Sequence, residues 1–351
     1  MGVEHIHNIL ALDDAIVTAV ADPSPTSQEW ARRAVGDEAD LCCFGSAAEL
    51  VESGRCDAVV IASPNFTHVD VLRTVLASDL HVLVEKPLCT TLADCREVVE
   101  LERAGPAGRV VWMGLEYRYM PPTRRLMAEL AAGTVGDVKM VAIREHRFPF
   151  LEKVGDWNRF NRNTGGTLVE KCCHFFDLMN EVTGARPVRV MASGAQSVNH
   201  LDERYDGETP DILDNAFVIV DYDSGARGLL DLCMFAEASK NEQEISVVGD
   251  EGKLEALVTE SVLRVGRRSD GLHAITEQTI TDDQVKHVGL HHGASYLEHV
   301  DFAAAIRNGA PPAVTLLDGL WSVAIGVAGH RSIDTGSPVY LADLPELAGL
   351  D

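Results

Sequence analysis

Short apolar runs alternate with helical stretches over the first third of this 351-residue chain, and this alternation constrains the fold more than any other feature. The runs are rich in Val, Ile, Leu and Ala and are typical of buried strands; they lie at 15–22, 56–63, 81–84 and 109–114. Apolar residues at helical spacing occupy 1–10, 27–35, 46–53, 68–77 and 91–104. Strands that alternate with helices predict a parallel sheet with right-handed crossovers.

The N-terminus resembles part of a dinucleotide-binding unit. In such a unit a strand and the sequence G-x-G-x-x-G precede the first helix, and an acid follows about 20 residues later, after the next strand. Gly2 matches the last glycine and Asp22 the acid. A carboxylate there accepts the ribose hydroxyls of NAD and repels the 2′-phosphate of NADP. We therefore expect a Rossmann-type sheet whose first strand and glycine loop are truncated here and encoded in frame upstream of Met1.

Two strand ends in this half carry polar residues. Ser63, Pro64, Asn65 and His68 follow one strand, and the next strand ends in Glu85-Lys86-Pro87. Open α/β sheets bind ligands at the carboxyl ends of their strands. Pro87 fixes its own φ and can form a cis bond, so it can hold Lys86 in one direction. The alternative for the charged pair is a surface ion pair.

The pattern changes after Pro121-Pro122. A helix at 123–132 precedes longer strands near 138–147, 215–221, 228–235, 244–248 and 261–266. Several of these strands are joined by tight turns, which favours an open, mostly antiparallel sheet. Helices near 295–308 and 318–335 and a short strand at 339–341 close the chain. We predict a dinucleotide-binding domain at 1–120 and an α+β domain for substrate binding and oligomerisation at 121–351.

The amino-acid composition limits the classes of binding partner that we expect for this chain. The chain has 30 Lys and Arg against 54 Asp and Glu, a net charge of −24, which disfavours nucleic acid and anionic membranes. It contains no long apolar span and no signal-peptide pattern. Its eight cysteines lack CxxC spacing, so we expect reduced thiols and a cytoplasmic protein. His287, His291, His292 and His299 fit no usual ligand spacing, and we expect no metal.

Catalytic groups are predicted on a helix at 168–182 that follows Gly165-Gly166. Glu170 and His174 are four residues apart, and Asp177 follows three residues later, so the three share one face of a regular helix. Carboxylates beside an imidazole can orient and tune a general acid or base. A histidine buried for structural reasons is the alternative.

These motifs, in this order, resemble the Gfo/Idh/MocA family of NAD(P)-dependent oxidoreductases, which includes inositol and sugar dehydrogenases. The resemblance implies that Lys86 contacts the nicotinamide ribose and the substrate hydroxyl, that Glu85 places Lys86, and that His174 moves the hydroxyl proton. It also implies that Asn65 and His68 lie along the cofactor. The free face of the second sheet commonly forms homodimers or homotetramers in this family. Glu170 replaces the family's usual aspartate, so it either orients substrate hydroxyls or tunes His174.

Further side chains are candidates for substrate binding. Tyr117 and Arg118 follow the strand at 109–114, and Trp157 and Arg159 precede the glycine pair. The alternative role for Tyr117 and Arg118 is packing at an interface. The alternative for Trp157 and Arg159 is a position in a solvated loop. His291, or its neighbour His292, can contact a substrate hydroxyl.

The predicted activity is hydride transfer between NAD and a hydroxyl or keto carbon of a sugar, cyclitol or related polyol. Oxidising an alcohol removes a proton and a hydride, so a base must reach the O–H while a cation stabilises the alkoxide. One alternative is a glycosidase that uses NAD for oxidation and elimination. Another is a non-catalytic dinucleotide sensor, although such a sensor has no need of Lys86 and His174.

Overall fold

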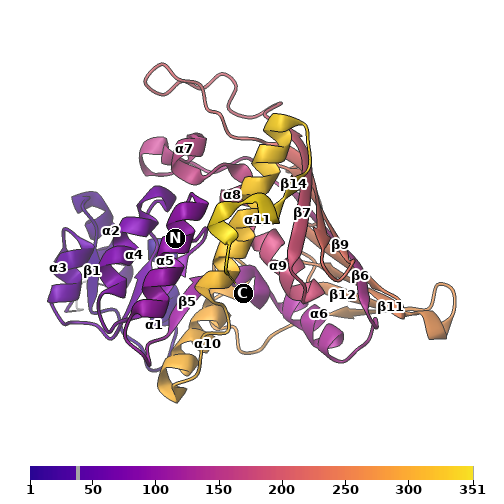
Figure 1. Cartoon of the computed structure of the whole chain (residues 1–351). Helices are drawn as coiled ribbons and strands as arrows, with labels where there is room; N and C mark the ends of the chain where they lie inside the picture. The colour runs from indigo at the N-terminus through magenta and orange to yellow at the C-terminus, as the bar shows by residue number, and fades with distance from the viewer. Residues whose placement is uncertain (37–39, 351) are drawn as a thin grey trace. The chain divides into compact units, whose positions relative to one another are not determined.

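The computed structural model describes residues 1–36 and 40–350. It divides into two compact units (Figure 1). The first contains 1–89, 93–119 and 283–320, and the second contains 90–92, 120–282 and 321–351. The predicted boundary at 120 lies close to this division. We did not predict from the sequence that residues 283–320 return to the first unit.

The first unit holds the parallel strands. β1 (Ala19–Ala21) pairs with β2 (Cys42–Phe44), and β4 (His81–Glu85) lies between β3 (Ala58–Ile61) and β5 (Val111–Gly114). All three pairings are parallel, which confirms the prediction. Val82, Leu83 and Val84 are completely buried, as expected for a strand covered on both faces. The helices are α1 (Gly2–Leu10), α2 (Pro25–Val35), α3 (Ala47–Glu52), α4 (His68–Leu76), α5 (Leu92–Ala104) and α10 (Ala294–Asn308).

The late segment 283–320 completes the core of the first unit. The ring of Phe302 on α10 contacts that of Trp112 on β5 edge to face, with their centroids 6.1 Å apart. The backbone N–H of Met113 donates to the carbonyl of Val314 at 3.1 Å. The core of this unit is therefore built from residues nearly 200 positions apart in the sequence.

The second unit is built on a nine-stranded sheet in the order β13-β12-β11-β10-β6-β9-β8-β7-β14. All neighbours are antiparallel except β6 and β9, so the predicted mostly antiparallel sheet is confirmed. The strands span β6 (Val138–His146), β7 (Pro187–Ala195), β8 (Asn215–Tyr222), β9 (Arg227–Cys233), β10 (Gln243–Gly249), β11 (Gly252–Leu257), β12 (Val262–Arg267), β13 (Ile275–Thr279) and β14 (Val339–Tyr340).

Helices cover one face of this sheet. α9 (Cys173–Thr183) packs against β6, and α6 (Pro121–Ala131) packs against β11 and β12 (Figure 1). Pro121 and Pro122 form the first turn of α6 and do not precede it, because proline fits the positions whose N–H has no helical partner. Of α11 (Leu316–Thr335), residues 316–320 belong to the first unit and 321–335 to the second.

Candidate active site

In the first unit, the centre of the predicted site is the carboxyl end of β4. The buried Glu85 accepts from Nε2 of His5 on α1 at 2.8 Å and from the backbone N–H of Lys86 at 3.1 Å. Burial raises the pKa of Glu85, but the hydrogen bond and charge of His5, with the charge of Lys86, lower it to about 2. Glu85 is therefore an anion that fixes the backbone at Lys86.

A second histidine extends this pair into the core. Nδ1 of His5 lies 2.9 Å from Nε2 of the buried His299 on α10. Burial, followed by the charge of His5, lowers the pKa of His299 to about 3, so His299 is neutral at pH 7. His5 was not predicted from the sequence, because it is 80 residues away from Glu85.

The turn after Lys86 is held from the opposite side. The Lys86–Pro87 bond is cis. His68 is fully buried, with Nδ1 2.8 Å from the carbonyl of Pro87 and Nε2 3.0 Å from the carbonyl of Ser63. The His68 side chain thus joins the two loops in which the sequence analysis placed cofactor-binding residues.

The donors and acceptors of the first unit fit a dinucleotide. Asp22 directly follows β1, and its Oδ1 accepts from the backbone N–H of Ser24 at 2.7 Å, which fixes the carboxylate. Asn65, just beyond β3, is buried, and its Nδ2 has no hydrogen-bond partner within the described residues. A buried amide without a partner is costly unless a ligand satisfies it. Gly2 is the first residue of α1 and Pro64 precedes Asn65, so each keeps its predicted position.

Two predicted substrate-binding residues meet in the first unit. The ring of Tyr117 lies 6.2 Å from that of His291, and Arg118 lies 3.7 Å from Asp318. Glu116 directly precedes Tyr117 in the sequence and belongs to the same short helix. Its carboxylate lies 3.3 Å from Nδ1 of His291 and accepts from the hydroxyl of Ser295.

Glu116 is a proton-carrying group at neutral pH. Burial, and next the negative charge of Glu85, raise its pKa to about 7, and the hydrogen bond from Ser295 opposes this shift. His291 is partly exposed and connects this buried carboxyl group to solvent. The arrangement can store and release a proton close to neutral pH.

In the second unit, the expected regular helix is interrupted. α8 (Thr167–Glu170) ends before Lys171, and α9 begins at Cys173. The N–H of Cys172 donates to the carbonyl of Thr167 at 3.3 Å, a bond five residues back that marks a local π-type turn. Glu170 and His174 are both buried and lie on either side of the interruption. The prediction of one continuous helix is therefore wrong, and the shared face of Glu170, His174 and Asp177 stays a prediction.

The interruption is anchored by a buried ion pair. Lys171 Nζ lies 2.9 Å from Glu145 Oε1 on β6, and both side chains are buried. Burial lowers the pKa of Lys171, and the charge of Glu145 opposes this. Lys171 thus joins α8–α9 to the sheet.

A second anchor, also missed from the sequence, is His330 on α11. Burial lowers its pKa to about 4, so its neutral Nε2 accepts from the N–H of Leu168 at 3.1 Å. A Cβ at Gly166 would lie 2.3 Å from this nitrogen, and Gly166 has φ of +90°. Glycine is therefore needed for the close approach of His330 to the start of α8.

The loop before α8 is also ordered by charge. Arg159 is buried, and its Nε donates to Glu203 at 3.1 Å, while Asn163 donates to the carbonyl of Trp157 at 2.9 Å. Arg159 therefore has a structural partner, and substrate binding by Arg159 and Trp157 stays a prediction.

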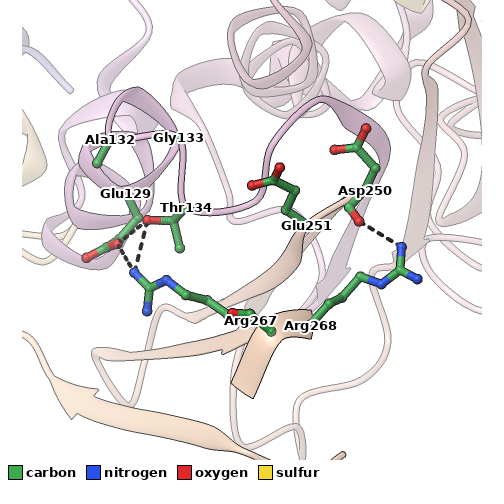
Figure 2. Close-up of a pocket in the computed structure, with 9 residues that line it drawn as sticks. Glu129, Ala132, Gly133, Thr134, Asp250, Glu251, Arg267 and Arg268 are labelled. Atoms are coloured by element: carbon green, nitrogen blue, oxygen red, sulfur yellow. Dashed lines mark hydrogen bonds and ion pairs between the residues drawn. The ribbon is translucent and has the colours of Figure 1, made fainter. Parts of the chain in front are cut away.

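A pocket of about 570 Å³ lies elsewhere in the second unit (Figure 2). It is lined by the end of α6, the turn between β10 and β11, and the end of β12. Arg267 lies 3.8 Å from Glu129 and donates to Thr134, and Arg268 donates to the carbonyl of Asp250. Both arginines thus have partners within the pocket. None of the residues predicted to be functional lines it.

The parallel sheet and the polar residues at its strand ends define a dinucleotide-dependent oxidoreductase. Residues 1–115 match the family description "Oxidoreductase family, NAD-binding Rossmann fold", and residues 128–341 match "Oxidoreductase family, C-terminal alpha/beta domain". The chain belongs to this Gfo/Idh/MocA family, which confirms the resemblance seen in the sequence. In the described residues, no helix is both long and apolar enough to cross a membrane.

Relatives match along almost the whole chain. Myo-inositol 2-dehydrogenase of Thermotoga maritima is 26% identical over 98% of this chain and 96% of its own length. The scyllo-inositol 2-dehydrogenase (NAD(+)) of Bacillus subtilis is 26% identical over 97% of this chain and 93% of its own. A crystal structure of a probable dehydrogenase from Thermotoga maritima has a TM-score of 0.77 at 25% identity, covering 97% and 96% of the two chains. Levoglucosan dehydrogenase, crystallised with NADH and levoglucosan, has a TM-score of 0.83 at 18% identity, covering 97% and 96%, and shows the shared fold.

Proposed function

We propose that this protein transfers a hydride between NAD and a hydroxyl or keto carbon of a sugar, cyclitol or related polyol. The observation that carries the proposal is Glu85, held by His5 and followed directly by Lys86, at the end of a parallel strand in an NAD-binding domain. Two inositol dehydrogenases that match both domains support a cyclitol or a similar polyol as substrate.

Within this proposal the residues have distinct roles. Gly2, Asp22, Ser63, Pro64 and Asn65 hold NAD, which supplies or accepts the hydride when bound. Because its nitrogens are occupied by backbone carbonyls, His68 acts as a positioning residue for the loop.

Proton transfer is assigned to two other side chains. Lys86 stabilises the alkoxide that forms on the substrate oxygen, and His174 takes or returns the hydroxyl proton. Glu170 orients substrate hydroxyls, with tuning of His174 as the alternative. Tyr117, Arg118 and His291 contact the rest of the substrate.

Absorbance of NADH, measured with a panel of cyclitols and sugars, tests the activity. We expect NADH to form with at least one free polyol. Release of sugar from a glycoside without net NADH would instead identify the glycosidase. NAD binding with no turnover on either class would favour the sensor.

The first prediction concerns cofactor choice. We expect kcat/KM to favour NAD over NADP, because Asp22 repels a 2′-phosphate by about 2 kcal/mol, or roughly 30-fold. Asp22→Ser should reduce this ratio, whereas Asp57→Ser, which removes a different acid of the same unit, should not. Equal kcat/KM values for the two cofactors in the unsubstituted protein would contradict the assignment.

We further propose a homodimer or homotetramer formed through the free face of the large sheet. The register places Met191, Ile219 and Leu229 in one row across β7, β8 and β9, and all three are exposed. Phe217 (60% exposed) and Met140 (56% exposed) extend this apolar face. A patch of this kind on a sheet marks an interface. Two ion pairs within the chain, Arg144–Asp231 and Arg189–Asp221, flank it, as expected for the polar rim of an interface between two copies.

The second prediction tests this interface. Phe217→Glu should convert the oligomer to a smaller species, because a carboxylate would be buried without a partner. Leu272→Glu, at a residue that is 93% exposed outside this face, should leave the mass unchanged. Molar mass from light scattering measures both. A monomeric unsubstituted protein at micromolar concentration would rule the proposal out.

A cytoplasmic location is part of the same proposal. All eight cysteines are free, as expected for a chain kept in a reducing compartment.

A further inference from the structure

We propose that Glu4, His7 and His287 form a binding site for a divalent transition-metal ion, with Zn²⁺ as the preferred class. The three residues belong to the first unit: Glu4 and His7 lie on α1, and His287 lies in the loop before α10. The site is separate from every residue to which the proposed oxidoreductase activity assigns a role.

The helix and a distant loop bring the ligands together. Glu4 and His7 are three residues apart on α1 and therefore lie on the same helical face. One ligand atom from each of Glu4, His7 and His287 lies within 4.8 Å of the other two. The rings of His7 and His287 are edge to face, with centroids 5.9 Å apart.

The nitrogen of His287 at this site faces the Glu4 carboxylate without a hydrogen bond. Its Nε2 is buried and makes no hydrogen bond within the described residues, and the carboxylate of Glu4 is 3.6 Å away. A buried polar atom without a hydrogen bond is unfavourable. A metal ion between His287 and Glu4 would satisfy the nitrogen.

The loop after His287 is shaped around the Glu4 carboxylate. The backbone N–H of Leu290 donates to Glu4 Oε1 at 3.2 Å, which orients the ligand as outer-shell groups do in metal sites. A Cβ added to Gly289 would lie 1.8 Å from the same oxygen. Only glycine allows the loop to come so close to the carboxylate.

The donor set selects the class of ion. Two imidazoles and one carboxylate suit Zn²⁺, Co²⁺ or Ni²⁺, whereas Mg²⁺ and Ca²⁺ prefer oxygen ligands alone. Ligand atoms at about 2.1 Å from zinc lie about 3.4 Å apart in a tetrahedral site. Because His7 is exposed, its side chain can rotate inward to reach this spacing, and water completes the coordination.

The bound ion would act as a structural link. It would join α1 to the loop at 287–290, which is about 280 residues away in sequence. The same helix carries His5, the partner of Glu85, so the link would also restrain the helix that supports the end of β4. The sequence analysis considered the late histidines only with one another, and for that reason it expected no metal.

Titration calorimetry with Zn²⁺ on the full, untagged chain tests the site. We expect one ion per chain in the unsubstituted protein and an affinity at least about 100-fold weaker in His7→Ala and in His287→Ala. Gly289→Ala should weaken binding about tenfold by displacing Glu4. His273→Ala, which removes an exposed histidine elsewhere, should bind like the unsubstituted protein.

A second measurement separates loss of a ligand from loss of folding. Glu4→Gln keeps the acceptor for Leu290 N–H and the size of the side chain, so this variant should fold, bind Zn²⁺ more weakly and show no zinc-dependent rise in Tm. Co²⁺ should give visible absorption bands in the unsubstituted protein that are absent in His287→Ala. Unchanged zinc affinity in His7→Ala and His287→Ala, or no binding of one ion per chain, would overturn the proposal.

Discussion

His174→Ala is expected to lower kcat by about 100-fold or more while NAD still binds, because the variant has no group to take the hydroxyl proton. Lys86→Ala should cause a loss of similar size, since the developing alkoxide would have no cation beside it. Steady-state kinetics with the best polyol of the panel measures both losses.

Control variants show whether the loss of activity comes from the missing catalytic group or from loss of folding. His174 is buried, so His174→Gln, which nearly preserves the volume, and a melting curve for each variant show whether folding survives. His273→Ala should retain full activity. Full activity in both His174→Ala and Lys86→Ala would end the assignment of these residues to proton transfer.

Glu170 separates two mechanisms within the same experiment. If it orients hydroxyls, Glu170→Asp should mainly raise KM or change substrate preference. If it tunes His174, Glu170→Gln should lower kcat and move the pH profile to lower pH, because losing a carboxylate lowers the pKa of an imidazole.

Lys171→Met is expected to lower the free energy of unfolding by about 3–5 kcal/mol, because Glu145 would keep a buried charge without its closest cation. Glu145→Leu should have a similar effect, because Lys171 would then be buried without its carboxylate. The double variant Lys171→Met/Glu145→Leu should lose much less than the sum, since an apolar pair can replace a buried ion pair.

Urea unfolding of the four proteins completes the double-mutant cycle. Lys253→Met, which breaks the exposed pair with Glu255, serves as the control and should change stability by less than about 1 kcal/mol. A similarly small effect of Lys171→Met would show that the buried pair does not stabilise the second unit.

The parallel strands could be predicted because burial on both faces leaves continuous apolar runs, as at 81–84. Three strands of the large sheet were missed because they lack such an apolar run. β13 is exposed at every residue, β11 directly follows a tight turn, and β7 carries small residues at 192–195. Their pairing with neighbouring strands, and not their own pattern, places them in the sheet.

The residues of the candidate site could likewise be predicted only where their local sequence is distinctive. Glu85, Lys86 and Asn65 were found because each follows a recognisable strand. His5 and His330 were not, because their importance comes from partners far away in sequence, such as Leu168 for His330. The interruption at Lys171 was missed because the residues there are compatible with a regular helix.

The discontinuous first unit has a consequence for synthesis on the ribosome. When residue 120 has emerged, the nascent chain holds every strand of the parallel sheets, yet Met113 still lacks Val314, and Trp112 lacks Phe302. About 200 further residues must be translated before these contacts can form. The cofactor-binding half is therefore completed late, and its apolar core needs protection until then.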